Sequence, residues 1–233
     1  MPLYPPAGIY PSKARIYIFE DFYTFVSANG AGSGQFFVAI SGTGSSVTTG
    51  ASDANHPGVV AINTGTTTTG KSAVSTDVSA FLFGGGTWTF ECEVYIEDLS
   101  TAGEEYDLRI GFGDANTGDM TDGAYFEYDR NTRTNWSIVT ADNGTRTRAD
   151  SGVAVAADTW VTLKITVNAA GSSVAFFIDG TETTNSPSTS HIPTGAGRQF
   201  GLGAYIVKSA GSTSRSAYLD YITATNNLTT PRP

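Results

Sequence analysis

The chain has 233 residues, and its 13 Lys and Arg against 22 Asp and Glu leave a formal net charge of −9 at pH 7. An acidic surface repels phosphate backbones, so nucleic-acid binding is disfavoured, and no stretch approaches the roughly 18 apolar residues of a membrane span. Only 15% of residues are charged, and the abundance of Thr, Val, Phe, Tyr and Gly is typical of an all-β domain rather than a helical bundle.

The N-terminal segment, residues 1–15, carries prolines at positions 2, 5, 6 and 11 and is predicted to be an extended arm. It lacks a basic region followed by an apolar one, so we expect no signal peptide and a protein made in the cytoplasm rather than secreted. The single cysteine, Cys92, excludes an internal disulfide and lies in an apolar alternation, which predicts a small core residue.

Strand predictions begin with residues 16–22 and 35–40, the second of which lies between loops rich in Gly, Ser and Thr. Residues 55–65 begin with a turn and continue as a strand. The threonines at 66–69 follow, and four β-branched residues in a row disfavour a helix, so an extended, hydroxyl-rich edge is expected there.

The strongest signal is a period-two alternation, in which Trp88, Phe90, Cys92, Val94 and Ile96 face one way and polar residues the other. Asn143-Gly144 and Asp179-Gly180 are tight-turn signals between further strands. We predict an all-β fold, a two-sheet antiparallel β-sandwich in one domain over residues 16–226, followed by a tail, 227–233. The further strands expected are 106–112, 124–129, 136–140, 159–168, 174–180, 200–207 and 217–224.

Three segments, Trp160 to Val167, Phe176 to Gly180 and Asp220 to Ile222, resemble the concanavalin A-like lectin/glucanase jelly roll, which includes laminin-G-like modules. Upstream, His56 to Val60 and Thr64 to Gly70 resemble a segment of tailed-bacteriophage proteins with this jelly roll. The resemblance implies a non-enzymatic virion protein, either a capsid decoration or cement protein or a small tail-associated component. It would bind other virion proteins and form a homo-oligomer, with a trimer favoured by analogy.

Two alternatives remain open, a lectin-like module that attaches a particle to a cell-surface glycan and a glycan-cleaving enzyme. Glycan-cleaving enzymes of this fold are similar in a Glu-x-Asp-x-x-Glu strand, which is absent here. The residues that come nearest to this motif are Glu91, Glu93 and Glu97 on one strand and Glu127 and Asp129 on another. Glu91 and Glu93 share a face and are interpreted as a solvated sheet surface, so no catalytic residue is predicted.

Two sets of residues are candidates for ligand sites. Four oxygen-bearing side chains within nine residues could bind calcium, although an Asx-rich turn that caps strands is the preferred interpretation: Asp114, Asn116, Asp119 and Asp122. No other cofactor is expected. Aromatic residues that would serve as carbohydrate platforms, although most are expected in the core, are Tyr125, Tyr128, Trp136 and Tyr205. His56 and His191 are predicted to have loop or packing roles.

Overall fold

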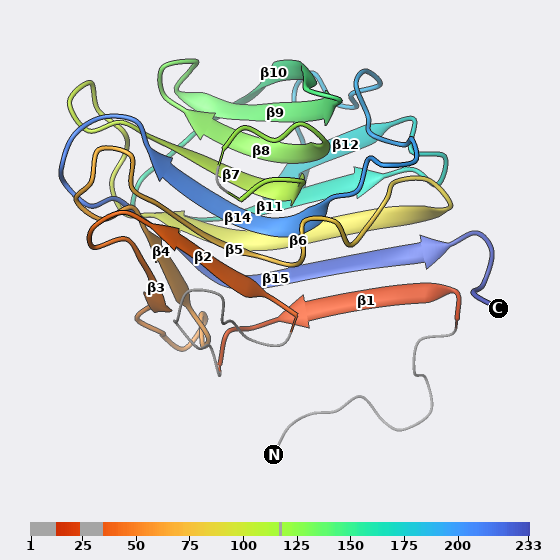
Figure 1. The fold of residues 1–233 in the computed structure, drawn as a ribbon, viewed down its shortest axis with the longest axis horizontal. Coiled ribbons are helices and arrows are strands. Elements are labelled where there is room, and N and C mark those ends of the chain that lie inside the picture. The colour runs from red at the N-terminus through yellow and green to blue at the C-terminus, as the bar shows by residue number, and fades with distance from the viewer. Residues whose placement is uncertain (1–12, 24–34, 117) are drawn as a thin grey trace.

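The computed structural model describes residues 13–23, 35–116 and 118–233. These residues form two antiparallel β-sheets that pack against each other, as the sequence predicts, and they contain no helix. Figure 1 shows the layers, with β1 (Arg15–Glu20) beside β15 (Ser216–Leu228) along the lower edge of the view. None of the described residues belongs to a helix of the length and apolarity that crossing a membrane requires.

The first sheet, called sheet A below, has β15 near its centre, and β1 pairs with the C-terminal half of that strand. Its remaining strands, in spatial order with β15 between β6 and β4, are β13 (Thr181–Glu182), β12 (Val174–Ile178), β11 (Trp160–Val167), β6 (Gly86–Ile96), β4 (Val60–Asn63) and β3 (Ser46–Thr49).

The second sheet, called sheet B, packs against sheet A. Its strands in spatial order are β10 (Thr145–Ala154), β9 (Asn135–Asp142), β8 (Gly123–Asp129), β7 (Tyr106–Gly113), β14 (Gly201–Lys208), β5 (Lys71–Ser75) and β2 (Phe37–Ser41).

The core lies between the two sheets and is rich in aromatic rings. Trp88 and Phe90 of β6 meet Phe112 of β7 with ring centroids 5.7 and 5.6 Å apart, and Phe126 of β8 meets Phe176 of β12 at 5.3 Å. These edge-on and tilted contacts add to the free energy of burying each ring. The alternation predicted for β6 is confirmed, because its apolar residues are buried and the residues between them are partly exposed.

Cys92 is one of these buried residues, as predicted, with an exposed fraction of 0%. Burial raises the pKa of its thiol well above the ordinary value, because an ionised thiolate loses its hydration in the core. The neighbouring carboxylates of Glu93, Asp220 and Glu91 act in the same direction.

The turn predictions are confirmed at two hairpins. Asn143 and Gly144 join β9 to β10 with φ values of 52° and 78°, and Asp179 and Gly180 join β12 to β13 with 49° and 76°. The threonines at 66–69, in contrast, form bends and a turn between β4 and β5 rather than an extended edge. Gly65 adopts φ +67° immediately before them and Gly70 N–H donates to the Thr67 carbonyl, which reverses the chain.

The described strands run from β1 near the N-terminus to β15 near the C-terminus. The first described strand starts at Arg15, and β15 continues to Leu228, two residues into the predicted tail. Most of the predicted Pro-rich arm, residues 1–12, lies outside the described residues.

Candidate functional site on the outer face of sheet A

A loop before β4 places a histidine over the outer face of sheet A. The Asp53 carboxylate accepts hydrogen bonds from the backbone N–H groups of Asn55 and His56 at 2.7 and 2.9 Å, which shapes the turn. It also contacts His56 Nδ1 at 3.1 Å. The imidazole then stacks on the indole of Trp160 in β11, with centroids 4.3 Å apart and planes 15° apart.

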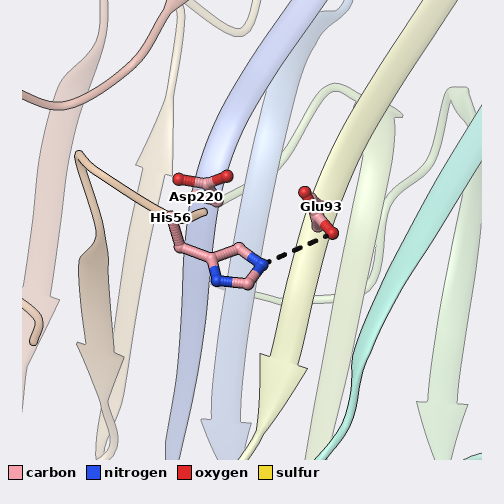
Figure 2. Close-up of side chains that lie close together, drawn as sticks. All are labelled: His56, Glu93 and Asp220. Carbon is pink, nitrogen blue, oxygen red and sulfur yellow. Dashed lines mark ion pairs between the residues drawn. The ribbon is translucent and has the colours of Figure 1, made fainter. Parts of the chain in front are cut away.

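Two carboxylates meet this histidine, Glu93 from β6 and Asp220 from β15 (Figure 2). His56 Nε2 lies 3.7 Å from Glu93 Oε1, and one atom from each of the three side chains lies within 4.8 Å of the others. Because a carboxylate only accepts hydrogen bonds, the contact with Asp53 places the proton of a neutral imidazole on Nδ1. The lone pair on Nε2 then faces Glu93.

A β-bulge in β15 brings Asp220 to this position. Leu219 pairs with Val94 of β6 and Ile222 pairs with Cys92, so three steps along β15 match two along β6. The extra residue keeps both Leu219 and Ile222 in the core, and Asp220 and Tyr221 between them lie opposite Glu93. Bulges commonly re-aim a side chain in this way beside functional sites.

Asp220 is strongly buried, with an exposed fraction of 4%. Its Oδ1 atom has no hydrogen-bond partner among the described residues. Burial raises the pKa of its carboxyl from the ordinary 3.8 to about 6, because the ionised form loses hydration. The charges of Glu93, Asp21 and Asp53 act in the same direction, and that of His56 opposes them.

An aromatic pocket of about 240 Å³ adjoins these three residues, because Asp53 and Trp160, which both contact His56, also line the pocket. Tyr95 stands between the indole and Tyr218, with ring centroids 5.4 Å from Trp160 and 5.7 Å from Tyr218. The pocket is completed by Ala51, Val59 and Glu97. Tyr95 Oη donates to Asp158 at 2.8 Å and Tyr218 Oη donates to Glu97 at 3.2 Å, so the tyrosine rings are held in place.

Two of the predicted carbohydrate platforms, Tyr125 and Tyr205, lie on the outer face of sheet B and are buried there, at 0% and 2% exposed. Neither hydroxyl has a hydrogen-bond partner among the described residues. Beside them, Glu127 is completely buried and accepts hydrogen bonds from Arg109 Nε at 3.0 Å and from Arg148 Nε at 2.6 Å. These ion pairs of Glu127 with Arg109 and Arg148 cover the outer face of sheet B beside the two tyrosines.

The other two predicted platforms, Tyr128 and Trp136, lie in the core between the sheets with exposed fractions of 2% and 1%. Their rings contact each other at a centroid distance of 6.3 Å. They stabilise the sandwich and present no surface to a sugar.

The predicted calcium residues engage protein donors. Asp114 accepts hydrogen bonds from the backbone N–H and the hydroxyl of Thr121. Asp119 forms an ion pair with Arg109 at 2.7 Å, and Asp122 accepts from Asn143 N–H at 2.9 Å. Asn116 lines a small groove on sheet B beside Tyr205. Calcium binding at these four residues stays a prediction.

Sequence reasoning named His56, Glu93 and Asp220 separately but did not bring them together. The sequence predicts a solvated sheet surface at Glu93, whereas its carboxylate adjoins His56, which stacks on Trp160. His191 does lie in a loop, where its Nδ1 contacts the Thr147 hydroxyl at 2.7 Å. The three residues are far apart in sequence, and only strand pairing and the bulge make them neighbours.

The two antiparallel sheets define a concanavalin A-like β-sandwich, the fold also found in lectins and glucanases. Within this class, the family described as SO2946-like, C-terminal domain, matches residues 55–220. The chain therefore belongs to that family. A comparison with curated proteins gives no significant match.

Three solved structures illustrate the likeness in fold. The protein of unknown function SO2946 from Shewanella oneidensis MR-1 has a TM-score of 0.67 and 16% identity, over 94% of this chain and 89% of that one. The carbohydrate recognition domain of Emp47p gives 0.59 and 11%, over 93% and 96%. The Bacillus licheniformis β-glucanase gives 0.55 and 12%, over 89% and 97%.

Proposed function

We propose that this chain is a carbohydrate-binding module that holds a neutral sugar in the aromatic pocket of sheet A. The observation that carries the proposal is the wall formed by Trp160, Tyr95 and Tyr218 next to the carboxylates of Asp53 and Glu97. Aromatic rings pack against the apolar face of a sugar ring, and carboxylates accept hydrogen bonds from its hydroxyl groups.

The pocket also limits the class of sugar. Its volume of about 240 Å³ is smaller than the roughly 300–1,000 Å³ typical of pockets for drug-sized ligands, so it suits a single terminal sugar ring. The lining carboxylates and the net charge of −9 disfavour sialic or uronic acids. The similarity to the Emp47p carbohydrate recognition domain supports the fold part of this proposal alone.

The test is a glycan array followed by calorimetric titration of the sugars that bind. We expect Trp160→Ala to abolish binding, because it removes the largest ring of the pocket. Tyr17→Ala is the matched control, since Tyr17 is 54% exposed on β1 and lies outside the pocket. Binding that survives Trp160→Ala, or an array without any signal, contradicts the proposal.

We further propose that the module does not cleave glycans, since no Glu-x-Asp-x-x-Glu strand is present. Glu93 and Asp220 approach each other from two strands, and Asp220 is nearly inaccessible beside the His56 ring. A reducing-sugar assay on the glycans bound is expected to show no product. Product that disappears in Glu93→Gln would instead identify an enzyme.

A second candidate function is assembly, as in the virion decoration, cement or tail role expected from the sequence resemblance. The observation that favours it is a set of exposed aromatic rings, Tyr17, Phe19, Tyr23 and Phe37, each more than half exposed. Tyr17 and Phe19 stack on each other at 6.5 Å. Light scattering would detect a trimer that dissociates in a Tyr17→Ser, Phe19→Ser variant, and a monodisperse monomer contradicts the role.

A further inference from the structure

We propose that His56, Glu93 and Asp220 form a binding site for a divalent transition-metal ion of the zinc class. This proposal does not depend on the glycan-binding proposal, although the site adjoins the aromatic pocket. Its three ligands come from the loop before β4, from β6 and from the bulge of β15 (Figure 2).

The spacing of the three side chains suits such an ion. Zinc lies about 2.0–2.2 Å from nitrogen and oxygen ligands, and tetrahedral geometry then separates two ligand atoms by about 3.4 Å. His56 Nε2 and Glu93 Oε1 are 3.7 Å apart, and no pair in the cluster exceeds 4.8 Å. Small rotations of the two carboxylates therefore bring all three ligands to bonding distance, with a fourth position for water.

The protonation of the histidine prepares it for the same role. Nδ1 contacts both oxygens of Asp53, at 3.1 and 3.2 Å, so a neutral ring presents its lone pair on Nε2. A carboxylate behind a histidine fixes the ring and raises its basicity in metal sites. Without a cation, this lone pair faces an acceptor, Glu93 Oε1, at a distance too long for a hydrogen bond.

Asp220 supplies the independent observation that points to a ligand. Its side chain is more than nine-tenths buried and offers an oxygen within 4.8 Å of the ligand atoms of His56 and Glu93 (Figure 2), and Oδ1 has no hydrogen-bond partner among the described residues. A buried acceptor without a partner destabilises the folded state, because it has lost its hydrogen bonds to water and forms none within the protein. A bound cation would supply the missing partner.

The charge around the cluster also favours a cation. Glu93, Asp21 and Asp53 all act on Asp220 as negative charges, and His56 is the opposing group. One imidazole nitrogen and two carboxylates suit zinc and the other divalent first-row transition metals, whereas calcium prefers six to eight oxygen ligands. The inference is therefore a transition metal rather than calcium.

The test is calorimetric titration of the EDTA-stripped full chain with Zn²⁺, and with Ca²⁺ in parallel. We expect one saturable zinc site per chain and calcium binding at least about tenfold weaker. Asp53→Asn should weaken zinc binding about 10–100-fold, because it removes the support behind the histidine. His56→Gln and Asp220→Asn should weaken it further, because they remove ligands.

His191→Gln is the matched control, because His191 is the second histidine of the chain and lies in a different loop. It should leave the zinc isotherm unchanged. No saturable binding to the wild type, equal loss in His191→Gln, or full binding in His56→Gln would each overturn the site.

A spectroscopic measurement on the wild type covers the case in which a variant does not fold. Co²⁺ bound to one imidazole and two carboxylates in a four-coordinate site gives visible d–d absorption stronger than that of hydrated Co²⁺. Added Zn²⁺ should displace the Co²⁺ and remove this absorption. A weak six-coordinate spectrum like that of hydrated Co²⁺ would overturn the proposal. Glycan titrations repeated in EDTA keep the two proposals separate. EDTA removes bound metal, so sugar binding that remains is due to the aromatic pocket alone.

Discussion

Replacing Asp220 by asparagine is expected to stabilise the metal-free protein above pH 6, although it removes a residue of the candidate site. Asp220 is 4% exposed, and burial raises the pKa of its carboxyl from 3.8 to about 6. Holding the ionised form therefore costs the folded state free energy, and a neutral side chain of nearly the same shape avoids this cost.

The magnitude follows from the pKa. A rise of about 2 units, at about 1.4 kcal/mol per unit, is worth about 3 kcal/mol. Because the folded pKa is raised, the favourable contribution of the protonated carboxyl is complete below about pH 4 and is lost as the pH rises through about 6. The stability difference between variant and wild type should therefore grow from near zero at pH 4 to at most about 3 kcal/mol above pH 6.

The assay is urea unfolding in EDTA at a series of pH values for both proteins. Glu97→Gln is the control, since Glu97 is an exposed carboxylate at the end of β6 and its change should stay within about 0.5 kcal/mol. A stability gain that does not vary with pH, or a variant less stable than the wild type at pH 7.5, would refute the reasoning. Adding Zn²⁺ should reverse the order by stabilising only the wild type.

Three further predictions test the fold, two by substitution and one by chemical modification. Glu127→Ala leaves Arg109 buried without its main partner and should cost about 3–5 kcal/mol in urea unfolding; a cost below 1 kcal/mol would contradict a buried ion cluster. Gly65 and Gly180 both have positive φ, but Gly65→Ala should destabilise the fold more than Gly180→Ala, because a Cβ at Gly65 would clash with the backbone of Ser45 and a Cβ at Gly180 would face open space. Cys92 should react with a thiol reagent only after unfolding, because burial raises its pKa; rapid modification of the native protein would show otherwise.

Much of the fold was predictable because its signals are local. The alternation along β6 identifies which residues face the core, and Asn-Gly and Asp-Gly pairs mark the hairpins at residues 143 and 179. Each signal depends on neighbours within a few residues. The Thr run at 66–69 shows the limit, because β-branched side chains favour extended backbone but Gly65 reverses the chain before them.

The composition and residue pattern alone determined the acidic charge, the all-β class, the two-sheet sandwich and the buried place of Cys92. The tertiary structure alone decided which polar and aromatic residues form a site. Tyr128 and Trp136 became core, while Trp160, His56, Glu93 and Asp220 gathered on sheet A. The physical reason is that these four come from three strands and a loop, and a one-residue bulge in β15 sets the face on which Asp220 lies.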